Sequence, residues 1–262
     1  MSDNKQKQYH IGASFGDIGE YCIITGDPAR CEQIAAHLDN SSHFGMNREF
    51  NIYNGYLLGR KISVCSTGIG GPSTAIAVEE LAACGARTVI RIGTCGGIDL
   101  DVLSGDVVIA SGAVRQDGTS REYAPIEFPA VADTDILFSL VESAKKSGVR
   151  YHAGVVQSKD SFYGQHAPSR MPTEGELKAK WEAWKRLGVL ASEMETSTLF
   201  TVGATLGLRC GAVFICLWNQ ERRLAGLDTD ADTADVDIAI KVAIEAIKKL
   251  IADDERKQAR AN

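Results

Sequence analysis

The sequence predicts an α/β fold: a single domain of layered α/β/α architecture built around a central mixed sheet. Short apolar runs alternate with longer helix-like stretches along the chain, which is the pattern expected of helices packed on a sheet. The 262 residues suit one open α/β domain, and a hydrophobic content of 44% can fill a sizeable core. No internal repeat or linker divides the chain, so we expect one domain over residues 1–262, with flexible ends at 1–7 and 253–262.

The individual elements are predicted from the apolar runs and from the residues that interrupt them. Each strand-like run leads into a glycine or a polar break, and Pro28 suits the first turn of the helix that follows the first run. Asn54-Gly55 and Gly59-Arg60 lie between strand-like runs and indicate an antiparallel hairpin, so the sheet should be mixed. The predicted strands include 21–24, 62–65, 88–92, 106–110 and 212–217, and the predicted helices are 28–38, 73–83, 135–146, 192–206 and 232–251.

The overall charge and the cysteines narrow the class of protein. A net charge of −6 without a basic stripe argues against nucleic acid or an acidic membrane as partner. The start of the sequence is polar, and no apolar run reaches the ~18 residues of a membrane span, so we expect a cytoplasmic protein. The seven cysteines are scattered and form no CxxC pair, which indicates reduced and mostly buried thiols.

Glycine-rich turns follow three of the predicted strands, at residues 25–30, 66–73 and 91–97. Glycines at such positions let the backbone approach a ligand and point N–H groups at an anion. Turns of this kind are common, so alone they are weak evidence. None has the glycine spacing of a dinucleotide fingerprint or of a P-loop, which disfavours both kinds of site.

Arg91 interrupts the apolar run Val89-Ile90-Arg91-Ile92 just before the third turn. An unpaired buried charge there would cost several kcal/mol, so something anionic should lie beside it. That partner can be a bound anion or an internal Asp or Glu, and the residues alone leave both open. Arg30 and Arg48, taken alone, would be solvated surface arginines.

Two carboxylates lie at the start of the predicted helix 192–206. Ser192 and Glu195 have the spacing of a capping box, which is a purely structural explanation. The alternative is that Glu193 and Glu195 accept hydrogen bonds from sugar hydroxyls while Met194 packs under the sugar ring. Spacing does not choose between them.

Taken together, these segments resemble the nucleoside phosphorylase family, which has pyrimidine-specific members and hexameric purine-specific members. The resemblance is spread from near the start of the chain to about residue 220 and is far more specific than any single turn. It includes CSTGIGGPS at Cys65–Ser73 and Glu193-Met194-Glu195. The other matching stretches are 9–12, 26–30, 47–50, 91–94 and 127–133.

The resemblance implies phosphorolysis of a nucleoside to free base and ribose 1-phosphate, as in nucleoside catabolism and pyrimidine salvage. It implies catalytic roles for Arg30, Arg91, Thr94, Gln165 and Glu195. The implied phosphate-binding residues are Gly26, Arg30, Arg48, Arg91 and Thr94, and the implied ribose-binding residues are His10, Glu193, Met194 and Glu195. The implied base-binding residues are Gly96, Phe162, Gln165 and Arg170.

The segment from Phe162 to Arg170 favours a pyrimidine such as uridine. Pyrimidine-specific relatives bind uracil with a glutamine and an arginine; Gln165 matches, but the arginine comes later than the family spacing, at Arg170. Purine-specific relatives carry an aspartate after the strand 212–217 that can protonate the purine, whereas this chain has Trp218-Asn219. The rival interpretations are a purine nucleoside phosphorylase, a nucleoside hydrolase and a non-catalytic nucleoside-binding subunit.

The resemblance also implies a homo-oligomer, a hexamer built as a trimer of dimers, in which His10 and Arg48 serve the neighbour's active site. The short segment before His10 looks unable to hold this side chain, so we expect the neighbour to fix it. No cofactor is expected besides phosphate as co-substrate. A potassium ion is implied between subunits, at Glu49, the Ile69 carbonyl and Ser73.

Overall fold

The computed structural model describes residues 6–227 and 234–261. Its strands are β1 Tyr21–Thr25, β2 Asp39–Asn47, β3 Phe50–Leu57, β4 Arg60–Ser66, β5 Thr88–Gly97, β6 Val107–Gln116, β7 Ala130–Val131, β8 Tyr151–Lys159, β9 Ala191–Glu193 and β10 Arg209–Asn219. Its helices are α1 Arg30–Ala35, α2 Gly71–Ala83, α3 Thr119–Tyr123, α4 Thr134–Ser147, α5 Phe162–His166, α6 Glu174–Arg186, α7 Thr196–Thr205, α8 Gln220–Leu224 and α9 Val236–Ala261, with a 3-10 turn at Pro168–Arg170.

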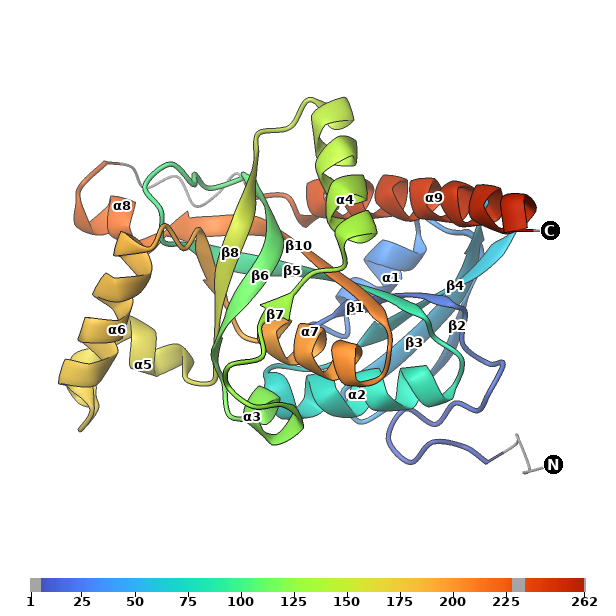
Figure 1. Cartoon of the computed structure of the whole chain (residues 1–262), viewed down its shortest axis with the longest axis horizontal. Helices are drawn as coiled ribbons and strands as arrows, with labels where there is room; N and C mark the ends of the chain where they lie inside the picture. Colours follow the sequence, from blue (N-terminus) through green and yellow to red (C-terminus); the bar gives the residue numbers. More distant parts are fainter. Residues whose placement is uncertain (1–5, 228–233, 262) are drawn as a thin grey trace.

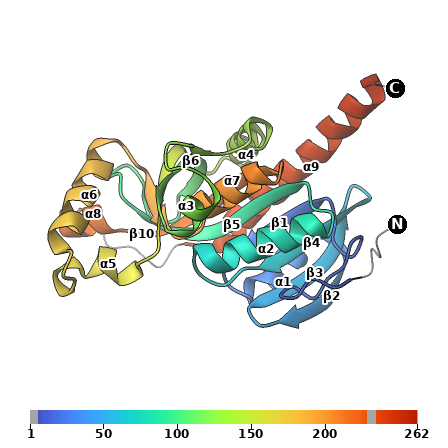
Figure 2. The same cartoon turned by 60° about the horizontal axis from the view of Figure 1, so that its bottom comes forward.

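Helices cover both faces of one sheet, as Figures 1 and 2 show. Side chains along a strand point alternately to the two faces, and in β1 Ile23 enters one core while Cys22 and Ile24 enter the other. Helices α2 and α7 close the core that holds Ile24, and helices α1, α4 and α9 close the core that holds Ile23. The predicted α/β/α layering is confirmed.

The sheet is mixed, as predicted, and it closes on itself at one end. Its order is β10-β6-β8-β9-β5-β1-β4-β3-β2, with β7 paired to β6. Strand β10 pairs with both β6 and β5, and β9 pairs with both β8 and β5, so these five strands form a ring. The open remainder runs from β1, parallel to β5 and β4, to the antiparallel strands β3 and β2.

One edge of β5 changes partner halfway along the strand. It pairs with β1 as far as Arg91 and with β9 from Gly96 onward. A crevice outside the carboxyl ends of strands, where the order of the sheet changes, is where open α/β sheets bind ligands. The fold therefore points to the region around Thr94, between these two pairings.

Most of the predicted elements are present, but some differ from the prediction. The first helix covers Arg30–Ala35 rather than residues 28–38. The hairpin turns at Leu58-Gly59, both with positive φ (51° and 75°), while Asn54-Gly55 lies inside β3. The helix predicted from Ser192 begins at Thr196, because Ser192 belongs to β9. The last helix starts at Val236 rather than at residue 232, which lies outside the described residues.

The chain end differs most from expectation. Instead of fraying from residue 253, α9 continues to Ala261. Asp254 accepts hydrogen bonds from the Tyr21 hydroxyl at 2.6 Å and from Arg209 Nη2 at 2.6 Å, which ties the last turns to β1 and β10. At the other end, residues 1–5 of the expected flexible start lie outside the described residues.

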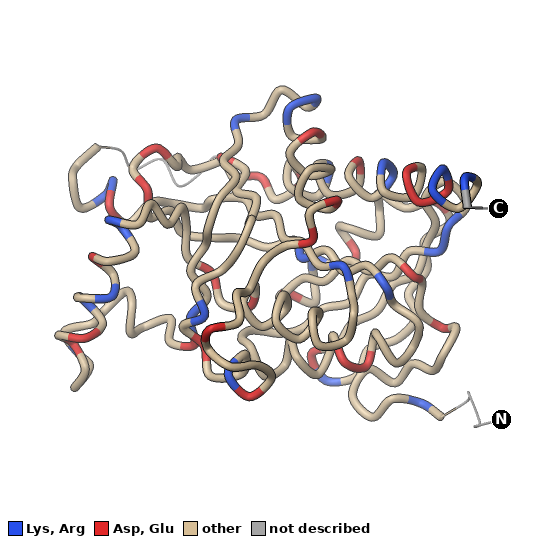
Figure 3. Tube along the Cα trace, in the orientation of Figure 1, with Lys and Arg blue, Asp and Glu red and all other residues tan. Residues whose placement is uncertain are grey.

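The distribution of charged residues in the structure agrees with the charge pattern of the sequence. Acidic and basic residues are interspersed along the described part of the chain, as Figure 3 shows. Among the described helices none is long and apolar enough to cross a membrane. All seven cysteines are free and buried, as predicted.

Candidate active site

A cavity of about 750 Å³ lies at the carboxyl ends of β1, β4 and β5. The three glycine turns meet there: Thr67 N–H donates to the Thr25 carbonyl at 2.8 Å, and a Cβ on Gly26 would lie 3.2 Å from the Gly68 carbonyl oxygen. The expected site residues that line it are Gly26, Arg30, Arg91, Thr94, Gly96, Phe162, Gln165, Glu193, Met194, Glu195 and Ile69. Segments far apart in the sequence thus form one site.

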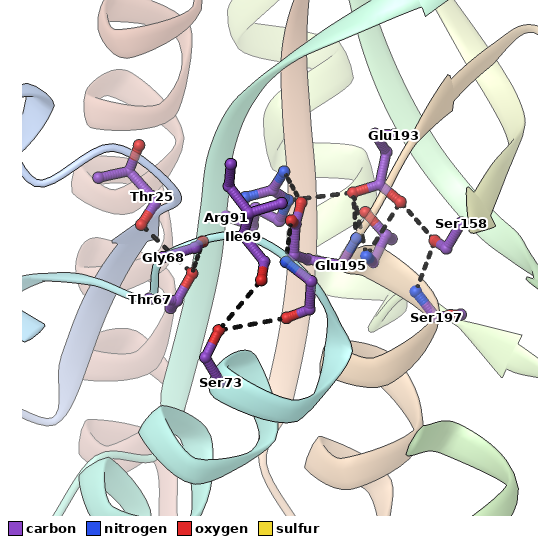
Figure 4. Close-up of polar contacts among 12 residues, drawn as sticks. Thr25, Thr67, Gly68, Ile69, Ser73, Arg91, Ser158, Glu193, Glu195 and Ser197 are labelled. Atoms are coloured by element: carbon purple, nitrogen blue, oxygen red, sulfur yellow. Dashed lines mark hydrogen bonds and ion pairs between the residues drawn. The ribbon is translucent and has the colours of Figure 1, made fainter. Parts of the chain in front are cut away.

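Arg91 is buried in the middle of β5 and pairs with two carboxylates (Figure 4). Its Nε donates to Glu193 at 3.2 Å and its Nη2 donates to Glu195. Gly93 makes room for this guanidinium, since a Cβ there would lie 2.9 Å from Nη2. Burial acts to lower the pKa of Arg91, but Glu195 and Glu193 outweigh it and raise the pKa. The internal partner that the sequence left open is therefore present.

The same arginine keeps one nitrogen free for a ligand. Arg91 Nη1 is buried and has no hydrogen-bond partner among the described residues. Arg30 lines the same cavity, where its Nη1 donates to Thr25 Oγ1 at 3.2 Å. Burial lowers the pKa of Arg30, and the charge of Arg91 contributes in the same direction. Guanidinium groups beside glycine turns are the kind of groups that bind anions such as phosphate, so phosphate binding by Arg30 and Arg91 stays a prediction.

Glu193 is a structural carboxylate in this arrangement. Its side chain is 1% exposed and accepts hydrogen bonds from Arg91, from Ser158 Oγ and from the backbone N–H groups of Glu195 and Thr196. The last two contacts satisfy the first turn of α7, so Glu193 takes the place of the capping box expected from Ser192 and Glu195. A carboxylate with this many donors has little capacity left for ribose.

Glu195 has fewer partners and is the better candidate for a sugar ligand. Its Oε1 accepts the Gly70 N–H at 2.6 Å, and its Oε2 accepts from Arg91. Burial raises its pKa, Arg91 opposes that shift and Glu193 adds to it. Met194 lies beside it on the cavity wall. Both residues line the cavity, and their contact with ribose stays a prediction.

The opposite end of the cavity is aromatic and amide-lined. Phe162 and Gln165 come from α5, and His166 lies 4.3 Å from Phe162 and 5.3 Å from Trp218 between ring centroids. Gln165 Oε1 accepts from Ser192 Oγ at 2.7 Å, and Ser192 Oγ accepts from Lys159 Nζ at 2.6 Å. A flat base with polar edges suits such a wall.

Arg170 is not brought to this cavity. It ends the 3-10 turn after α5, its side chain is exposed, and its guanidinium lies over the Tyr163 ring at 5.7 Å. The additional residues between Gln165 and Arg170 let the chain turn again before the arginine is reached. In this structure Arg170 therefore lies outside the cavity, whereas the family resemblance implies a position against the base.

His10 and Arg48 lie together outside the cavity of their own chain. His10 is already fixed, because its backbone N–H and its Nδ1 both bind the Glu80 carboxylate, at 3.0 Å and 2.7 Å. Contrary to the expectation from the sequence, a neighbour is therefore not needed to fix this side chain, while contact of His10 with the neighbour's ribose stays a prediction. Arg48 has a φ of 53°, and its guanidinium lies 5.9 Å from the centroid of the Tyr9 ring.

The three expected cation ligands gather around Gly68. Ser73 Oγ lies 3.4 Å from the Ile69 carbonyl oxygen (Figure 4), and a Cβ on Gly68 would lie 3.6 Å from Ser73 Oγ and 3.1 Å from Glu49 Cγ. Oxygen donors of this kind suit a hard cation. The residues present fit a potassium ion.

Sequence reasoning missed Lys159, Ser192, His166 and Trp218 as cavity residues. Lys159 resembles Arg91 in being a charge at the end of a buried run, Val156-Gln157-Ser158. The polar residues Gln157 and Ser158 hide this burial in the sequence, so only the structure shows it. His166 directly follows Gln165 in the segment expected to bind the base, so its position could have been inferred. Ser192 and Trp218 carry no comparable signal, because their neighbours in the cavity come from distant segments.

Comparison with known proteins identifies the family of this chain. The family model described as the Phosphorylase superfamily matches residues 20–252. Uridine phosphorylase of Treponema pallidum is 52% identical over 94% of this chain and 95% of its own, and uridine phosphorylase of Escherichia coli is 41% identical over 95% and 100%. A guanosine phosphorylase of Halorubrum lacusprofundi is 38% identical over 93% and 99%. The chain therefore belongs to the phosphorylase superfamily.

Proposed function

We propose that this chain is a uridine phosphorylase, a pentosyltransferase that reversibly converts uridine and phosphate into uracil and ribose 1-phosphate. The observation that carries the proposal is one cavity lined by two arginines, by the Glu195 carboxylate and by amide and aromatic side chains, among them Gln165 and Phe162. The 52% identity to a uridine phosphorylase over nearly the full chain supports it. As part of the same proposal, the reaction serves pyrimidine salvage in the cytoplasm.

The chemistry needs positioning and electrostatics, without a covalent enzyme intermediate. Arg30 and Arg91, with Thr94, would place a phosphate oxygen behind C1′ of the ribose. Glu195 would accept hydrogen bonds from ribose hydroxyls. The C1′–N1 bond breaks with its electron pair moving to the base, a C1′–O bond to phosphate forms, and the base later takes a proton from water.

Asn219 favours a pyrimidine substrate over a purine. An asparagine cannot protonate a leaving purine, and here its amide donates to the carbonyls of Asp99 and Val102, at 2.6 Å and 2.9 Å, while its Oδ1 caps α8. It is absent from the residues that line the cavity. The similarity to a guanosine phosphorylase makes a purine nucleoside the substrate to exclude by experiment.

We propose that the enzyme is a homohexamer, built from dimers that share active sites. The support is a set of exposed apolar side chains: Tyr9, whose ring lies against Arg48, is 76% exposed, Met46 57% and Ile69 77%. Exposed apolar surfaces mark interaction sites. In a two-fold pairing the same surface lies on both partners, so His10 and Arg48 would complete the neighbour's site while Glu49, Ile69 and Ser73 hold a potassium ion at the interface.

The test is a nucleoside panel assayed with and without phosphate. Uridine should be cleaved only with phosphate, faster than inosine or guanosine, and deoxyuridine and thymidine rank the tolerance for sugar and base changes. Equal base release in phosphate-free buffer would indicate a hydrolase. Faster cleavage of inosine would make the enzyme purine-specific, and nucleoside binding without turnover would leave a non-catalytic binding protein.

A further inference from the structure

Three of the described cavity-lining residues are lysine or arginine, and Lys159 is the one that does not lie at a glycine turn. The others are Arg30 and Arg91, which belong to the phosphate end. Lys159 ends β8, is 5% exposed and lines the cavity together with Phe162 and Gln165. Lys159 and Gln165 also line a second cavity of about 530 Å³, so both side chains belong to the wall between the two cavities.

The ammonium of Lys159 has unused hydrogen-bonding capacity. Its Nζ donates to Ser192 Oγ at 2.6 Å, and the described residues offer no second acceptor, although an ammonium carries three donors. A buried ammonium with a single neutral partner is costly for the fold. Burial accordingly lowers the pKa of Lys159 to about 8, against the opposing influence of Glu193, Glu195 and Cys95. Burial lowers the pKa of His166, and the positive charge of Lys159 lowers it further.

Ser192 connects this lysine to the residue expected to bind the base. Since Ser192 Oγ accepts from Lys159 and donates to Gln165 Oε1, the carboxamide oxygen of Gln165 is occupied. Its N–H₂ group then remains for a carbonyl oxygen of a base. With Arg170 outside the cavity, the base end would otherwise have no cationic donor among the lining residues.

We propose that Lys159 is a catalytic residue whose ammonium donates a hydrogen bond to a carbonyl oxygen of the leaving pyrimidine and stabilises the negative charge that develops as the C1′–N1 bond breaks. The inference rests on the proposed function and deepens it. A donor aimed at developing charge in a water-poor site contributes on the order of 10²- to 10³-fold in rate. The cost of burying the lysine then has a functional explanation.

The experiment compares Lys159→Met with the unaltered enzyme on uridine and on 5-fluorouridine, whose base is the more stable leaving anion. The variant should lose about 100-fold in kcat/KM with uridine and markedly less with 5-fluorouridine. In the unaltered enzyme kcat/KM should fall as the pH rises through about 8, because Lys159 loses its charge there. This decline should disappear in the variant, while any ionisation of the substrate itself affects both enzymes.

Lys178→Met is the matched control, because Lys178 lines the second cavity but is exposed and pairs with Glu174. It should leave both substrates unaffected, and Lys159→Arg should restore part of the uridine rate. Lys159→Met activity within threefold of normal, or an equal loss on both substrates, would overturn the inference alone. A drop in Tm together with an equal loss would reduce Lys159 to a structural residue. An unaltered enzyme inactive on uridine would overturn the proposed function and this inference with it.

Discussion

At the scale of single residues, the neighbouring carboxylates of Glu193 and Glu195 differ in their roles. Glu193 and Glu195 are separated by one residue, and both pair with Arg91. The carboxylate oxygens of Glu193 accept hydrogen bonds from backbone N–H groups at the start of α7. Glu195 accepts fewer hydrogen bonds, so its oxygens can still accept hydrogen bonds from a ligand in the cavity. The number of donors that each carboxylate already satisfies separates structure from function here.

Replacing Glu193 or Glu195 by glutamine should therefore produce opposite profiles. Glu193→Gln should mainly destabilise the protein, by about 3–5 kcal/mol, because the buried Arg91 loses a charged partner and backbone donors meet an amide. Glu195→Gln should mainly lower kcat/KM, and more for uridine than for 2′-deoxyuridine if the carboxylate binds the 2′-hydroxyl. Thermal unfolding and kinetics on both substrates measure the two effects. Identical profiles would refute this division of roles.

Arg30→Ala tests phosphate binding most directly. The side chain of Arg30 donates to the neutral hydroxyl of Thr25, so its replacement breaks no ion pair within the site. Loss of charged hydrogen bonds worth ~1.5–3 kcal/mol each should raise the KM for phosphate by roughly tenfold or more. The KM for uridine should change much less. Arg60→Ala, at an exposed pair with Glu255, is the control. An unchanged phosphate KM would return Arg30 to the surface role that it has when taken alone.

At the scale of elements, most strands and helices could be predicted because the two cores require apolar side chains at their buried positions, and these form recognisable patterns in the sequence. The continuous apolar run of β1, whose side chains enter both cores, and the apolar face of α4 are direct consequences of burial. The errors occurred where a distant segment decides. Ser192 has the spacing of a helix cap, yet its hydroxyl lies between Lys159 and Gln165, whose positions no local pattern contains. Arg170 lies outside the residues that line the cavity, because the 3-10 turn that it ends redirects its side chain.

Helix α9 makes a separate prediction about stability. Burial acts to raise the pKa of Asp254, but hydrogen bonds from Arg209 and Tyr21 outweigh it and hold the pKa below its ordinary 3.8. A depressed carboxyl pKa stabilises the fold at neutral pH, and this contribution is lost as the pH falls through the folded-state pKa. Asp254→Asn should thus cost on the order of 1.5–3 kcal/mol at pH 7, and less in acid.

The measurement is denaturant unfolding of both proteins at neutral and acidic pH. Glu255→Gln serves as the control, since its exposed pair with Arg60 is worth less than about 1 kcal/mol. If Asp254→Asn were as stable as the unaltered protein at pH 7, the end of α9 would not be docked as described.

At the scale of the whole molecule, the central issue is whether one chain completes its own site. His10 is fixed by Glu80, and Arg48 adopts a positive φ that costs about 1–3 kcal/mol, yet neither lines the cavity of its own chain. Preorganised side chains outside the cavity, next to the exposed ring of Tyr9, are what a shared site requires.

Mixing two inactive variants tests this arrangement. One carries His10→Ala with Arg48→Ala, and the other carries Glu195→Ala with Arg30→Ala. In a mixed dimer of shared sites, one site holds all four substitutions and the other holds none, so activity should return, up to about half of normal for each mixed dimer. Mass spectrometry confirms subunit exchange. If exchange is complete and activity stays absent, each chain completes its own site.

The central claim is that phosphate, and not water, attacks C1′ of uridine in this cavity. The most direct measurement is the reaction of uridine with phosphate in ¹⁸O-labelled water, with the sugar product followed by mass spectrometry. The cavity geometry predicts ribose 1-phosphate whose C1′ oxygen comes from unlabelled phosphate. Free ribose carrying ¹⁸O at C1′, formed at the same rate without phosphate, would contradict it.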